Sequence, residues 1–270
     1  MVDNNAPRLQ YCNAPYDRHS ADPYLNMTME SISAAGRLLA IIKRASGQPG
    51  QTLVFPTWGN VFGIPPDDRA AVYAAIAGVY RLVDNARDEV RSHPDLKQDL
   101  YLGALSNIEA AITNAQMNAQ WGQFVSQLQG SNLIALEFVA EQLDRFSSEQ
   151  LVEQSLLDEL RAMIEKVTNE LAASDIDPEL RRLLSQKLED ARHAILFYSI
   201  DGADGLRRAA EAAVGTVMVM NESAKPEQSK KPFVDYVDAI NKMLDIVSKA
   251  KPLAALVTSG VRALLTSGSR

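Results

Sequence analysis

The 270-residue chain is poor in cysteine, in aromatic side chains and in residues that break helices. Its single cysteine, Cys12, excludes an internal disulfide framework and a cysteine-based zinc site. Aromatic residues make up 6% of the chain, which is little material for a β-rich core. The 14 glycines and 12 prolines are fewer than an average chain of this length carries. These shortages favour an all-α fold.

Several functional signatures are also missing. The first residues show no basic segment followed by an apolar one, and no apolar run is long enough to span a membrane. We therefore expect a cytoplasmic protein with no transmembrane segment. The chain has no phosphate-binding glycine loop and no serine nucleophile elbow, so we expect no cofactor. His193 follows Glu189 and Asp190 at a spacing that suits a metal, but no second carboxylate–histidine pair accompanies it, and we expect no metal.

Apolar residues recur at three- and four-residue spacing through most of the chain, which predicts a multihelical bundle over residues 27–220. Residues 1–26 contain three prolines and no such periodicity, and are expected to form an extended arm. Within the bundle the helices are expected at 27–45, 67–90, 94–118, 121–128, 133–146, 149–173, 177–198 and 205–220. Residues 52–68 carry five glycines and prolines, and are expected to form an ordered loop whose Trp58 and Phe62 pack on the bundle.

The helices expected at 149–173 and 177–198 have the clearest signals. Asp177 is a helix-capping residue, and Pro178 suits the first helical position. The short connection between the two helices requires them to be antiparallel neighbours. Their apolar stripes predict that six side chains are buried: Leu160, Ile164, Val167, Leu184, Leu188 and Ile195.

A polar linker at 221–231 is expected to precede a C-terminal helical hairpin at 232–270. From Lys225 onward the chain has eight basic and four acidic residues, although its overall net charge is −7. A two-helix hairpin buries too little apolar area to be stable alone, so we expect it to dock on the acidic body or on a second copy. The expected docking residues are Phe233, Val237, Ile240, Leu244, Leu256 and Leu264. The same basic amphipathic hairpin could instead contact a membrane surface peripherally.

Residues 87–93 begin with Arg87 and end with His93, and this spacing resembles the Arg-x5-His motif of HEPN ribonucleases. The resemblance implies a helical, often dimeric enzyme that cleaves RNA without a metal. In it Arg87 would stabilise phosphate charge, and His93 would act as general acid or base. A helix end before Pro94 also accounts for both residues, because a cation suits a helix C-terminus and the residue before a proline forms a junction. The acidic isoelectric point, about 5.1, also speaks against a broad RNA-binding surface.

A longer resemblance runs from Trp58 to Gly215. It is carried by Trp58-Gly59-Asn60-Val61-Phe62, by Trp121 with Phe124, and by the pattern from Ala194 through Tyr198 and Gly202 to Leu206. These residues resemble a family of helical bacterial proteins without assigned biochemistry from mobile-element and phage-defence neighbourhoods. The resemblance implies a defence-associated role and transfers no catalytic residue.

The sequence thus leaves three functions open. The first is a non-enzymatic helical interaction or assembly protein in a bacterial anti-phage defence or stress pathway, which binds a protein partner or itself. The second is a HEPN-like ribonuclease that uses Arg87 and His93, and it alone would bind nucleic acid. The third is a membrane-acting effector that works through the C-terminal hairpin.

Overall fold

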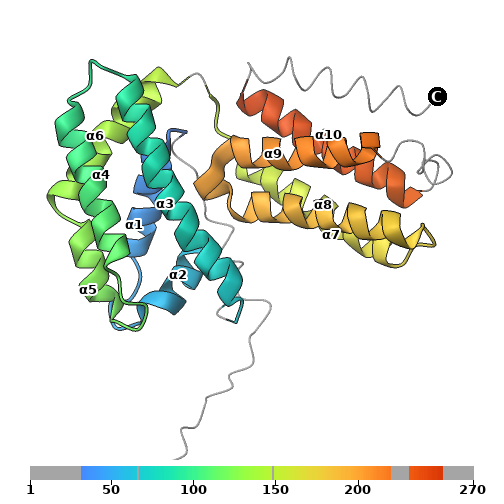
Figure 1. Cartoon of the computed structure of the whole chain (residues 1–270), viewed down its shortest axis with the longest axis horizontal. Coiled ribbons are helices and arrows are strands. Elements are labelled where there is room, and N and C mark those ends of the chain that lie inside the picture. The colour runs from blue at the N-terminus through green and yellow to red at the C-terminus, as the bar shows by residue number, and fades with distance from the viewer. Residues whose placement is uncertain (1–31, 66, 148, 220–230, 252–270) are drawn as a thin grey trace, which may run out of the picture.

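The computed structural model describes residues 32–65, 67–147, 149–219 and 231–251, and confirms an all-α protein (Figure 1). These residues form ten α-helices and one short 3₁₀ helix, with no strand among them. The helices are α1 (Ala34–Ser46), α2 (Val54–Phe62), α3 (Arg69–Ser92), α4 (Gln98–Thr113), α5 (Trp121–Val125), η2 (Ser126–Leu128), α6 (Ser131–Phe146), α7 (Gln154–Ala172), α8 (Pro178–Leu196), α9 (Tyr198–Val219) and α10 (Lys231–Ala250). The predicted arm at 1–26, the predicted linker except Lys231, and the second helix of the predicted hairpin lie outside the described residues.

Helices α1 to α6 enclose a first apolar core around two tryptophans. Trp58 and Trp121 are both buried and meet edge to face, with ring centroids 5.3 Å apart. The indole N–H of Trp121 donates to the Ala45 carbonyl at 2.8 Å, so this buried polar atom is satisfied. Leu53 and Gln120 form one isolated antiparallel bridge. The bridge ties the start of α2 to the start of α5.

Helices α7 to α10 enclose a second apolar core. Its helices α7 and α8 are antiparallel neighbours, as predicted (Figure 1). The Asp177 carboxylate accepts hydrogen bonds from the backbone N–H groups of Glu179 and Leu180, both at 3.0 Å, and Pro178 occupies the first turn. The six side chains predicted to be buried on these helices are all buried: Leu160, Ile164, Val167, Leu184, Leu188 and Ile195.

The two cores meet where α9 follows α8. Phe197 and Ile200 are buried in the first core, although most of α9 belongs to the second. Ile200 packs so closely on α3 that a Cβ added to Gly78 would stand 2.9 Å from Ile200 Cδ1. Gly202 has a φ of 59°, and the guanidinium of Arg37 lies against it. The gap expected between the helices at 177–198 and 205–220 is therefore only a kink at this glycine inside α9.

The prediction of a loop over residues 52–68 is wrong, because α2 occupies most of that segment. Pro56 lies in the first turn of α2, where a helix needs no N–H donor. Gly63 ends α2 in the left-handed conformation, with φ of 64°. The helix-breaking residues thus mark the two ends of a helix instead of interrupting it. Trp58 and Phe62 are buried, as predicted.

Three predicted helix starts are also wrong. Helix α1, expected from residue 27, begins at Ala34 with Ser33 as its N-cap. Helix α4 begins at Gln98 rather than at Pro94, because His93 has non-helical backbone angles and its carbonyl accepts a turn hydrogen bond from Leu96 N–H at 3.1 Å. Helix α7 begins at Gln154 rather than at residue 149. The chain before it pairs instead with the end of α10, where the Gln150 N–H donates to the Ala250 carbonyl at 2.8 Å.

Candidate functional site

Arg87, the cation of the ribonuclease-like motif, links α3 to α4. Its Nη1 donates to Asp84 Oδ1 at 2.9 Å, and its Nη2 donates to Ser106 Oγ at 3.3 Å and to Glu109. Only 13% of the side chain is exposed. The hydrogen bond to Glu109 is the main reason that the pKa of Arg87 is raised. The Arg87 guanidinium is therefore occupied by hydrogen bonds to other side chains of the protein.

His93 lies at the other end of the motif, and its surroundings are different. Its ring stacks on Phe146, with centroids 4.3 Å apart. It lines a cavity together with Glu89, and Arg87 is not part of that lining. Six positions along a helix rotate a side chain by about 240°. The described structure therefore does not bring Arg87 and His93 together at one site.

The cavity at this histidine has a volume of about 200 Å³ and lies where the two cores meet. Glu89 accepts the Ala34 N–H there, at 2.9 and 3.0 Å from its two oxygens, and burial raises the pKa of Glu89. Lys251, which also lines the cavity, contacts Glu149 at 2.6 Å and Asp204 at 2.7 Å. These hydrogen bonds and ion pairs connect the segments that form the walls of the cavity.

Helix α10 is the first helix of the predicted C-terminal hairpin, and it packs against α7 and α9. Of the predicted docking residues, Phe233, Ile240 and Leu244 are buried, Val237 is partly buried, and Leu256 and Leu264 lie outside the described residues. Two ion pairs connect α10 to the acidic helix α7. Lys242 Nζ lies 2.9 Å from Glu159 Oε2, and Lys231 Nζ lies 3.0 Å from Glu170 Oε1.

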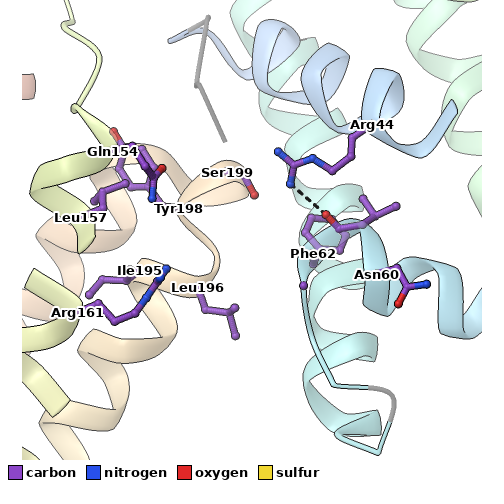
Figure 2. A pocket seen from close by; sticks show the side chains of 12 residues that line it. Arg44, Asn60, Phe62, Gln154, Leu157, Arg161, Ile195, Leu196, Tyr198 and Ser199 are labelled. Carbon is purple, nitrogen blue, oxygen red and sulfur yellow. Dashed lines mark hydrogen bonds between the residues drawn. The ribbon is translucent and has the colours of Figure 1, made fainter. Parts of the chain in front are cut away.

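A second cavity, of about 50 Å³, lies between α1 and α2 on one side and α7, α8 and the start of α9 on the other (Figure 2). Arg44 and Arg161 are among the residues that line it. Arg44 Nη1 donates to the Val61 carbonyl at 3.0 Å, and burial lowers the pKa of Arg44. The sequence alone does not reveal this cavity, because its residues come from distant segments and form no motif.

No protein-family model, curated protein or solved structure matches this chain. Its function must therefore be inferred from its own geometry. Within the described ranges, no group of three histidine, cysteine, aspartate or glutamate side chains is placed to hold a metal. His193 lies 3.4 Å from Glu189 on the same helix. None of the described helices combines the length and the apolarity that crossing a membrane requires.

Four large apolar side chains of α4 and α6 are exposed. Phe146, at the end of α6, is 52% exposed and stacks on His93, and the other three lie on the outer surfaces of the two helices. Ile134 and Phe138 lie one turn apart on α6 and are 54% and 57% exposed, and Leu100 on α4 is 55% exposed. The two helices are antiparallel neighbours (Figure 1), and the side chain of Asn107 donates to that of Asn132 at 3.1 Å. This register places Leu100 at the level of Phe138. These three residues are called the α4–α6 patch below.

Proposed function

We propose that this chain is a non-enzymatic helical interaction and assembly protein that acts in the bacterial cytoplasm and self-associates through the α4–α6 patch. The proposal rests on the exposure of three large apolar side chains on two adjacent helices. Single exposed apolar residues are normal on a monomer, whereas a group of them marks a contact surface. A twofold-symmetric dimer is the commonest assembly that covers one such surface with a second copy of itself.

The resemblance of residues 58–215 to helical proteins of mobile-element and phage-defence neighbourhoods supplies the biological setting. The proposal therefore includes a role in an anti-phage defence or stress pathway. Neighbouring genes that encode other defence components would support this role, and neighbouring housekeeping genes would count against it.

The described geometry supports neither of the two alternative functions. A HEPN-like ribonuclease needs its arginine and histidine at one site, but Arg87 is held by Glu109 and does not share a cavity with His93. A membrane-acting effector needs the apolar side of the hairpin to be free. On α10 that side is buried against the second core, as Ile240 and Leu244 show.

Sedimentation velocity over a concentration series tests the proposed self-association. Burying one half-exposed side chain in an interface contributes about 1 kcal/mol to the free energy of association. In a symmetric dimer each side chain occurs twice in the interface, once from each copy. Replacing Ile134 and Phe138 together with aspartate removes four such contributions, roughly 4 kcal/mol, and should raise the dissociation constant about a thousandfold. The matched control replaces Met218 and Val234 together with aspartate, which adds the same two charges at 39% and 44% exposed positions on α9 and α10.

The wild-type chain and the control should shift from monomer to dimer as concentration rises, while the double variant stays monomeric. A wild-type chain that remains monomeric at every concentration contradicts the proposal, and so does a double variant that assembles as the control does. The same preparations, incubated with RNA, test the enzymatic alternative. Cleavage that disappears in His93→Ala would replace the assembly function with the ribonuclease.

A further inference from the structure

The smaller cavity between the two cores combines positive charge with hydrogen-bond donors. Its polar lining side chains are Arg44, Asn60, Gln154, Arg161, Tyr198 and Ser199 (Figure 2). Neither an aspartate nor a glutamate is among the described residues that line it. Arg161 also pairs with Asp158 just outside the lining, so the net positive charge at the cavity comes mainly from Arg44. Such a charge, with no carboxylate in the lining, attracts an anion.

Arg44 holds a partly buried charge that no carboxylate offsets in the described part of the chain. Its guanidinium donates to the Val61 carbonyl at 3.0 Å, a neutral acceptor. Burial lowers the pKa of Arg44, whereas the pKa of Arg87 is raised through its hydrogen bond to Glu109. A buried charge is costly unless it is paired, so an anion in the cavity would stabilise Arg44.

The opposite wall supplies further donors. Ser199 is 3% exposed, and its hydroxyl points across the cavity toward the Arg44 guanidinium (Figure 2). Arg161 lies on the same wall as Ser199, and its Nη1 is 3.5 Å from Asp158 Oδ1, which is outside the lining. The two walls together surround the cavity with groups that can donate to an oxyanion.

The volume limits the ligand to a small group. The cavity offers about 50 Å³, several times the roughly 10–15 Å³ that one ordered water needs, so it can hold one oxyanion but not a nucleoside. Guanidinium groups bind phosphate oxygens through paired hydrogen bonds, and hydroxyl groups add to them. We propose that this cavity binds a phosphate group through Arg44, Arg161 and Ser199, and that the bound group bridges the two helical cores. The site lies apart from the α4–α6 patch, so it can be tested independently of self-association.

Thermal unfolding of the full chain in inorganic phosphate, compared with chloride at equal ionic strength, tests this site. At about ten times its dissociation constant, phosphate should raise the unfolding midpoint by roughly 3–6 °C. Arg44→Met keeps the length of the side chain and removes its charge. It should abolish the rise, and in chloride it should melt no lower than the wild type, because the uncompensated charge is gone. The matched control is Arg91→Met, since Arg91 is an exposed arginine on α3 paired with Asp88, and it should keep the full rise.

A purely structural Arg44 gives the opposite pattern, namely a lower midpoint in chloride and an unchanged rise in phosphate. That pattern overturns the proposal, as does a wild-type midpoint that does not respond to phosphate. Ser199→Ala provides a second, milder variant. In isothermal titration with inorganic phosphate it should weaken binding several-fold and leave the midpoint in chloride unchanged, and unweakened binding would count against the site.

The source of the phosphate group can be separated with a second probe. Glycerol phosphate that binds as tightly as inorganic phosphate would identify the ligand as a phosphate ester whose remaining part extends out of the cavity. Inorganic phosphate that binds while glycerol phosphate does not would identify the free ion. Either result supports a phosphate site, and binding of neither probe refutes it.

Discussion

Replacing Gly78 with alanine tests the close contact that joins the two cores. A Cβ at this position would stand 2.9 Å from Ile200 Cδ1 and 3.0 Å from Ile200 Cγ2. Ile200 is 1% exposed, so its side chain cannot move into solvent. Overpacking of this kind costs about 1–3 kcal/mol, while replacing a glycine inside a helix gains about 0.5–1 kcal/mol. We therefore expect Gly78→Ala to lower the free energy of unfolding by about 0–2.5 kcal/mol.

The same substitution should have the opposite sign once Ile200 is shortened. Ile200→Ala removes both atoms that the new methyl group would meet, and by itself it costs about 2–5 kcal/mol. In that background Gly78→Ala should stabilise the protein by about 0.5–1 kcal/mol, which gives a coupling energy of about 1–3 kcal/mol. Gly103→Ala on α4 is the control. A Cβ there meets nothing within 4 Å, so it should have the same effect in both backgrounds.

Urea denaturation followed by circular dichroism measures the four free energies of this cycle. Effects of Gly78→Ala and Ile200→Ala that add within about 0.3–0.5 kcal/mol would refute the contact. They would also show that the contact between Gly78 on α3 and Ile200 on α9 does not join the two cores.

Three further predictions concern single groups in the fold. Burial raises the pKa of Glu89, so the folded chain holds this proton more tightly than the unfolded chain, and stability falls as pH rises from about 4.5 through the raised pKa. In Glu89→Gln the free energy of unfolding in urea should fall less over that range, and parallel curves would contradict the assignment. Replacing Ile240 and Leu244 together with aspartate places two charges in the second core and should release α10, seen as faster limited proteolysis, whereas Val234→Asp at an exposed position should not. Leu184→Ala should lower the free energy of unfolding by about 2–5 kcal/mol, and a loss below about 0.5 kcal/mol would be inconsistent with its burial.

The helical fold was predictable where local signals and periodicity agree. Asp177 and Pro178 mark the start of α8, and the apolar spacing around Leu184 identified its buried face. The α2 segment was not predictable in this way, because Pro56 and Gly63 were interpreted as interruptions. Proline and glycine are tolerated at helix ends, and only the packing of the segment decides that a helix lies between them.

The candidate sites were less predictable than the fold. The α3 spacing from Arg87 to His93 could have shown that the two side chains leave the helix on different faces, since each residue turns it by about 100°. The phosphate-sized cavity had no sequence signal, because Arg44, Arg161 and Ser199 line one cavity only after the two cores pack together. The exposed pair of Ile134 and Phe138 also depends on packing, since an apolar residue on a helix predicts burial until its neighbours are known.

The most direct measurement of self-association is the distance between spin labels on two copies of the chain, by pulsed electron paramagnetic resonance. One label is placed at Arg145→Cys in a Cys12→Ser background. Arg145 is exposed and lies two helical turns beyond Phe138 on the same face of α6. A symmetric contact through the α4–α6 patch predicts a short, well-defined intermolecular distance there, and a longer one for a label at Val234→Cys on α10. Absence of intermolecular coupling at Arg145→Cys, or a shorter distance at Val234→Cys, would contradict assembly through the patch.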